Sequence, residues 1–191
     1  MIGYPRDMRA PTPPSRCVST SRRGFIGSLA ILGGASTAAA FVSRQDRPAA
    51  LAAEIVRDFV ASAHSDVDAV RQMVKESPAL VLASHDWGGG DFETGLNAAS
   101  HVGRRDIAEV LLDAGARLDL FAMGMLGELD LLRPIVEAHP TQLRAPGPHG
   151  FTLLHCATRG EEAAASTVDW LKEQGLTDMK VPLDQGRLSA P

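Results

Sequence analysis

The chain is poor in aromatic residues, in cysteine and in positive charge. Phenylalanine, tryptophan and tyrosine make up 5% of its 191 residues. This low content argues against a β-sandwich, because β-strands are enriched in aromatic and β-branched side chains. Hydrophobic residues at 45% and charged residues at 22% are ordinary values for a globular domain. Together with the many Ala, Leu and Gly residues, they favour short helices that pack closely.

Cysteine is too scarce for a disulfide framework. The two cysteines are Cys17 and Cys156, and Cys17 lies in an N-terminal segment that we expect to be removed. Cys156 is then alone, and we expect it to be a small buried side chain. The sequence also lacks His-x-His, His-Glu-x-x-His and Cys-x-x-Cys patterns. We therefore expect no resident metal and no cofactor.

The charge balance is acidic. The net charge is −4 over the whole chain, and the first 40 residues hold five of the arginines but only one acidic residue. The remainder is therefore more acidic than the whole, and it contains no stripe of Lys and Arg. A protein of this kind is a poor candidate for binding nucleic acid, so we expect no nucleic-acid partner.

Residues 1–40 have the pattern of an export signal. Arg22, Arg23 and Phe25 lie in the sequence Ser-Arg-Arg-Gly-Phe-Ile, directly before a stretch without charge. This sequence resembles the twin-arginine export signal, which is read by a receptor. The resemblance implies transient contact with the twin-arginine export machinery and a periplasmic or secreted protein.

The uncharged stretch 24–42 allows two outcomes for the leader. Ala38 and Ala40 form a small-x-small cleavage site, and a later site lies as far along as residue 52. The stretch is also close to the roughly 20 residues that span a bilayer, so an uncleaved leader would anchor the protein. Because it contains few strongly apolar residues, we favour cleavage and expect no stable membrane insertion afterwards.

Beyond a polar linker at residues 41–52, the chain repeats itself. Segments that begin at Ser65, Gly103 and Gly127 align without a gap, and residues 168–175 match their last turn. Self-similar segments of this length are typical of stacked repeat architectures. We expect the repeats to cover residues 53–176 and residues 177–191 to form a C-terminal tail.

A second motif shows which kind of repeat this is. The sequence Thr152-Leu-Leu-His155-Cys-Ala157 lacks only the proline of the signature Thr-Pro-Leu-His-x-Ala. With the aligned segments, it resembles the ankyrin repeat. The resemblance implies an all-α fold, an ankyrin-repeat α-solenoid of about four degenerate helix-turn-helix repeats. It further implies a non-catalytic module that binds a folded protein partner through its concave face and finger loops.

Carried over by register, the ankyrin resemblance also indicates contact residues. On the concave face these are His64, His101, Val102, Met125, Leu126 and Arg159. On the loops they are Trp87, Asp91, Glu93, Pro148, His149 and Phe151. Trp87 has two interpretations: an interface anchor, since Trp is enriched at binding hot spots, or a lid folded back over the first repeat.

Two other functions compete with protein binding. Asp86, Asp91, Glu93, His101 and His149 gather on predicted loops, as a small-ligand site, a metal site or a weak enzyme would require. A membrane-anchored accessory subunit is the other alternative, if the leader is retained. No spacing of residues typical of catalysis is present, and no Gly-x-Ser-x-Gly motif occurs. We therefore expect no enzymatic activity and name no catalytic residue.

Overall fold

The computed structural model describes residues 48–183. The export signal, most of the linker and residues 184–191 of the tail lie outside this range. Also outside it are the predicted export and cleavage residues, Arg22, Arg23, Phe25, Ala38 and Ala40. Among the described residues, no helix has the length and apolar character needed to cross a membrane.

The described range is mainly helical, as expected from the sequence. Its α-helices are α1 (Ala53–Ser62), α2 (Val67–Glu76), α3 (Gly95–Val102), α4 (Arg105–Asp113), α5 (Leu120–Leu126), α6 (Leu129–Ala138), α7 (Leu153–Arg159) and α8 (Ala165–Glu173). Short 3-10 turns connect them: η2 (Pro78–Leu82), η3 (Pro140–Arg144), η4 (Pro148–Gly150) and η5 (Glu161–Ala164). Its two strands, β1 (Ser84–Asp86) and β2 (Phe92–Thr94), pair in an antiparallel hairpin.

Polar side chains fix where several helices begin. Asp66, Thr94, Asp119 and Thr152 each accept a hydrogen bond from the backbone N–H three residues later. Such N-caps satisfy a backbone donor that the helix itself leaves free. Thr94 and Asn97 form a reciprocal capping box, which fixes the junction between β2 and α3.

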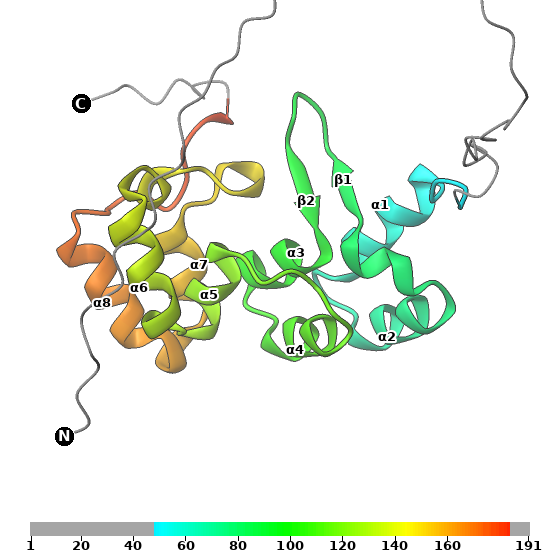
Figure 1. Ribbon diagram of the computed structural model, residues 1–191, viewed down its shortest axis with the longest axis horizontal. Coiled ribbons are helices and arrows are strands. Elements are labelled where there is room, and N and C mark those ends of the chain that lie inside the picture. The colour runs from blue at the N-terminus through cyan, green and yellow to red at the C-terminus, as the bar shows by residue number, and fades with distance from the viewer. Residues whose placement is uncertain (1–47, 184–191) are drawn as a thin grey trace, which may run out of the picture. The chain divides into compact units, whose positions relative to one another are not determined.

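The helices pack as four consecutive pairs. The two helices of each pair contact one another, and α1, α3, α5 and α7 contact their neighbours in turn (Figure 1). The apolar side chains between the pairs form two buried clusters, one centred on Phe59, Ile107 and Leu111 and the other on Leu132 and Leu171. Each pair thus covers the apolar side of the next pair.

Two irregular segments complete the structure. The hairpin β1–β2 rises above α3 (Figure 1) and pairs His85 with Glu93. Residues 177–183, predicted as part of a tail, run back beside η4, where the Val181 N–H donates to the Gly150 carbonyl over 2.8 Å. Phe151 and Lys180 form an antiparallel bridge in the same place.

Candidate metal centre

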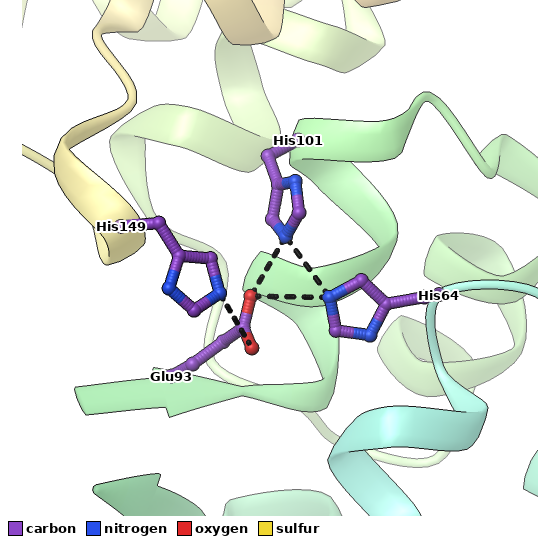
Figure 2. Close-up of side chains that lie close together, drawn as sticks. All are labelled: His64, Glu93, His101 and His149. Atoms are coloured by element: carbon purple, nitrogen blue, oxygen red, sulfur yellow. Dashed lines mark hydrogen bonds and ion pairs between the residues drawn. The ribbon is translucent and has the colours of Figure 1, made fainter. Parts of the chain in front are cut away.

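Four side chains from four separate elements converge on one point. His64 follows α1, Glu93 lies in β2, His101 lies near the end of α3, and His149 lies in η4 (Figure 2). Their potential ligand atoms, one from each residue, all lie within 4.8 Å of one another. We call these four residues the His₃Glu cluster.

The separations inside the His₃Glu cluster begin at hydrogen-bond length, and none exceeds 4.8 Å. His101 Nε2 lies 2.8 Å from Glu93 Oε1 and 3.1 Å from His64 Nε2. His64 Nε2 lies 3.6 Å from Glu93 Oε1, and His149 Nε2 lies 3.4 Å from Glu93 Oε2. Ligand atoms around a tetrahedral zinc ion, at about 2.0–2.1 Å from it, are about 3.3 Å apart.

Two of the imidazoles are held by hydrogen bonds through their other nitrogen. His64 Nδ1 lies 3.0 Å from the Val60 carbonyl oxygen, and His149 Nδ1 lies 2.7 Å from a carboxylate oxygen of Asp91. Both oxygens only accept, so each Nδ1 carries the proton. In the neutral ring, Nε2 then presents a lone pair to the cluster, which is the arrangement found in metal-binding histidines.

Asp91 also positions the loop that carries His149. Its second carboxylate oxygen accepts the backbone N–H of His149 over 2.8 Å. His149 itself adopts a left-handed backbone conformation, with φ of 58°. This conformation is uncommon for a residue with a side chain, and the paired hydrogen bonds to Asp91 hold the residue in it.

His101 is positioned by aromatic stacking. Its ring stacks on Phe151 at 4.8 Å between centroids, and Phe151 stacks in turn on His155 at 4.1 Å. His155 Nε2 lies 2.9 Å from the His101 carbonyl oxygen and therefore donates to it. His101 is accordingly the most buried of the three histidines, with 7% of its surface exposed.

Glu93 is a fully buried carboxylate. Burial opposes its charge and by itself raises its pKa. Hydrogen bonds from His101 and from the indole N–H of Trp87, together with positive charge on His64 and His101, outweigh burial and hold the pKa of Glu93 below its ordinary value. Its ion-pair partners within residues 48–183 are histidines, with no Lys or Arg among them.

The donor set determines what the cluster can do chemically. Three imidazole nitrogens and one carboxylate suit zinc and other divalent transition metals, whereas calcium and magnesium prefer oxygen ligands. The side chains of His64 and His149 are 27% and 26% exposed, and that of Glu93 is buried. An ion would therefore reach the cluster from the side of these two histidines.

The structure brings together most of the residues predicted as contact sites. Glu93, His101 and His149 belong to the His₃Glu cluster, and Trp87, Asp91 and Phe151 contact its members. His64, expected on the concave face, joins them. Trp87 is 40% exposed, yet its indole N–H lies 2.8 Å from Glu93 Oε2. Its ring therefore lies against the buried carboxylate of the cluster, and not over the apolar core of the first helix pair.

The remaining predicted contact residues lie elsewhere. Val102, Leu126 and Arg159 occupy the ends of α3, α5 and α7, outside the cluster. Met125 is fully buried among apolar side chains, so it offers nothing to a partner protein. Glu93 is equally inaccessible, because Trp87 and the three histidines enclose it. Helical register alone does not distinguish an inward-facing side chain from its exposed neighbour.

The comparisons with known proteins returned no relative. No protein-family model matches the chain, and no curated protein and no solved structure matches it significantly.

Proposed function

We propose that the protein binds a divalent transition metal ion, with zinc favoured, through His64, Glu93, His101 and His149. The ion cross-links elements of a repeat scaffold and stabilises it. One face of this scaffold binds a partner protein outside the cytoplasm. This proposal replaces the expectation of no metal, which rested on the absence of local ligand motifs in the sequence.

One observation carries the proposal: two lone pairs face a buried carboxylate. When these rings are neutral, the hydrogen bonds at Nδ1 make Nε2 of His64 and of His149 a lone pair directed at Glu93, at 3.6 and 3.4 Å. Lone pairs and a carboxylate repel one another unless a cation or a hydrogen-bond donor lies between them. The one N–H that His101 can place at Nε2 lies between Glu93 Oε1, at 2.8 Å, and His64 Nε2, at 3.1 Å, and it does not serve His149. A buried charge is also costly without a partner of opposite charge. A metal ion removes both penalties at once.

The surroundings of the cluster support the same conclusion. Metal-binding histidines commonly donate their second N–H to a carboxylate or a backbone carbonyl, which orients the ring. His149 does so to Asp91 and His64 to Val60. Trp87 orients Glu93 in a similar way. Its indole N–H donates to Oε2, and Oε1 then faces His64 and His101.

Four protein ligands favour a binding site over a catalytic one. Structural zinc sites have four protein ligands, whereas catalytic zinc sites keep one position for water. With all four members ligating, a tetrahedral ion has no position left for a substrate. The proposal is therefore that the protein is not an enzyme.

For the scaffold, we propose an ankyrin-like solenoid. Its four short helix pairs, the capping threonines and the glycines at helix ends support this assignment. The contact surface for a folded protein then includes Val102, Leu126 and Arg159, at the ends of successive first helices. Nucleic acid is not among the proposed partners, because the chain is acidic.

Export by the twin-arginine route agrees with a bound metal. That route characteristically carries proteins that have already folded, often with a cofactor in place. The ligands span His64 to His149, so the ion binds only once the helix pairs have assembled. We propose that the protein takes up its metal before export and acts in the periplasm or after secretion.

The rival explanation is a metal-free network in which a histidine carries an extra proton. An imidazolium would also supply the positive charge that Glu93 requires. The two explanations differ in metal content, in metal affinity and in the effect of removing the carboxylate charge. All three are measurable on the purified protein.

The test uses the mature chain without an affinity tag. Elemental analysis of protein dialysed against zinc, followed by calorimetric titration of metal-free protein with zinc chloride, should give one ion per chain. Glu93→Gln, which keeps the shape of the side chain, should lose binding by at least about a hundredfold. The exposed histidine His139 lies outside the cluster, so His139→Gln is the matched control and should bind as the wild type does.

Thermal unfolding gives a second measurement of the same proposal. An ion that binds only the folded state, at a free concentration of 100 Kd, stabilises it by about 2.7 kcal/mol. For a domain of this size the melting temperature should rise by about 5–15 °C. Glu93→Gln should show no rise. A wild-type protein that retains no zinc and melts identically with and without it would refute the proposal.

A further inference from the structure

A cavity lies at the His155 end of the His101–Phe151–His155 stack. It encloses about 340 Å³ between the end of α3, helix α7 and the returning segment 177–183. Its lining residues include His155, Thr158 and Arg159 of α7 and Met179 of the returning segment. None of these residues belongs to the His₃Glu cluster.

One cation lines this cavity and a second lies near it. Arg159 is a lining residue; Lys180 is not, but it follows the lining residue Met179, and its ammonium lies 4.8 Å from the centre of the Phe151 ring. Neither residue forms an ion pair within the part of the chain that the structure describes, although the surface as a whole is acidic. An unpaired arginine that lines a cavity is suited to bidentate binding of a planar anion.

One acidic side chain, Glu161, also lines the cavity, and its negative charge must be counted against the nearby cations. Glu161 lies two residues after Arg159, yet the two form no ion pair. Glu161 adopts a left-handed conformation, with φ of 53°, and its side chain is exposed. Within the lining, the charges of Arg159 and Glu161 are opposite and equal in number, and Lys180 adds a positive charge nearby.

The apolar part of the lining defines the rest of the ligand. Val102 forms one wall, and Met179, which is 43% exposed, forms another. A volume of about 340 Å³ accommodates a small organic molecule, within the usual range for ligand pockets. Flexible Met side chains adapt to apolar groups of varied shape.

We propose that this cavity binds a small organic anion, a molecule bearing a carboxylate or phosphate group, with Arg159 as its principal contact. Lys180 adds a second positive charge, and Val102 and Met179 cover the apolar part of the ligand. The site is separate from the metal centre, and its ligand does not coordinate the ion.

The test measures binding of two probes, inorganic phosphate and succinate, by calorimetry on the mature chain at low salt. The wild type should bind at least one of them, and Arg159→Gln should weaken that binding about tenfold or more, the usual effect of losing a charge-assisted hydrogen bond. Arg117→Gln is the matched control, because Arg117 is exposed and lies outside the cavity.

Repeating the titration on zinc-loaded and on chelated protein distinguishes the two sites. Binding that persists without zinc and depends on Arg159 supports the cavity. Binding that needs zinc and ignores Arg159 places the anion on the metal and overturns this proposal, while leaving the metal centre intact. Absence of binding up to millimolar probe, or equal binding by the Arg159 and Arg117 variants, also overturns it.

Discussion

The indole N–H of Trp87 donates to Oε2 of Glu93 over 2.8 Å, so a partly exposed ring is fixed to a fully buried carboxylate. The ring also packs edge-on against His85, at 4.5 Å between centroids, and lies 6.0 Å from His149. The bond occupies one oxygen of Glu93 and leaves the other to His64 and His101. The tip of the hairpin and the His₃Glu cluster are thereby directly connected.

The first prediction concerns this hydrogen bond. Trp87→Phe retains an aromatic ring but removes the donor, so Oε2 is released and Glu93 is free to rotate. We expect zinc affinity to fall about tenfold, as is usual when a partner of a ligand is lost. Competition with a chromophoric chelator measures the change. Phe92→Leu, at an exposed position of the same hairpin, should leave zinc affinity unaltered; an equal loss in both variants would point to general damage to the hairpin.

A second prediction concerns Asp91, which orients His149. Asp91→Asn keeps the size of the side chain but removes the charge, and it weakens the 2.7 Å hydrogen bond to His149 Nδ1. We expect a 10- to 100-fold loss of zinc affinity, the usual effect of changing such a partner, with the fold retained by circular dichroism. Asp86→Asn is the control, because the Asp86 carboxylate accepts from the Gly88 N–H and does not contact the cluster. Unchanged affinity in Asp91→Asn would mean that His149 is not a ligand.

The sequence predicted the helical architecture well because its signals are local. Thr152, which caps α7, and Gly115, which follows α4 in a left-handed conformation, each act within a few positions of the chain. Trp87 and Asp91 also lie on a loop, as the sequence predicted, because the Gly-rich segment between β1 and β2 forms the turn of the hairpin.

The His₃Glu cluster was not predictable in the same way. His64 and His101 are 37 positions apart, and His149 meets Asp91 across 58 positions. No ligand spacing exists within one helix or loop, so the sequence contains no metal motif. Only the packing of successive helix pairs and the return of η4 toward the hairpin bring these side chains together. The burial of Glu93 likewise depends on Trp87 closing over it.

The third prediction is the pH dependence of stability without metal. The folded-state pKa of Glu93 lies below its ordinary value of 4.5. A carboxyl group with a lowered pKa stabilises the fold fully above its unfolded value, and this contribution is lost as the pH falls through the folded value. In chelated protein, the urea midpoint of the wild type should therefore fall more steeply than that of Glu93→Gln below about pH 4.5. Parallel curves for the two proteins would show that the carboxylate is not stabilised by its neighbours.

The fourth prediction tests the packing of the helix pairs. Gly127 ends α5 in a left-handed conformation, with φ of 79°, and a Cβ there would collide with the backbone of Ala163 and Ala164. Gly115 has a similar φ of 93° but faces open space.

Both Gly→Ala substitutions therefore incur the conformational cost, about 1 kcal/mol. Gly127→Ala adds overpacking against backbone that belongs to the next helix pair, worth a further 1–3 kcal/mol or so. Chemical denaturation followed by circular dichroism measures the difference between the two variants. Gly115 faces open space, so zinc should stabilise Gly115→Ala as much as it stabilises the wild type. Zinc does not relieve the clash with the backbone of Ala163, so Gly127→Ala should be the less stable variant at every zinc concentration. Equal stability of the two would mean that η5 does not pack against the end of α5 in solution.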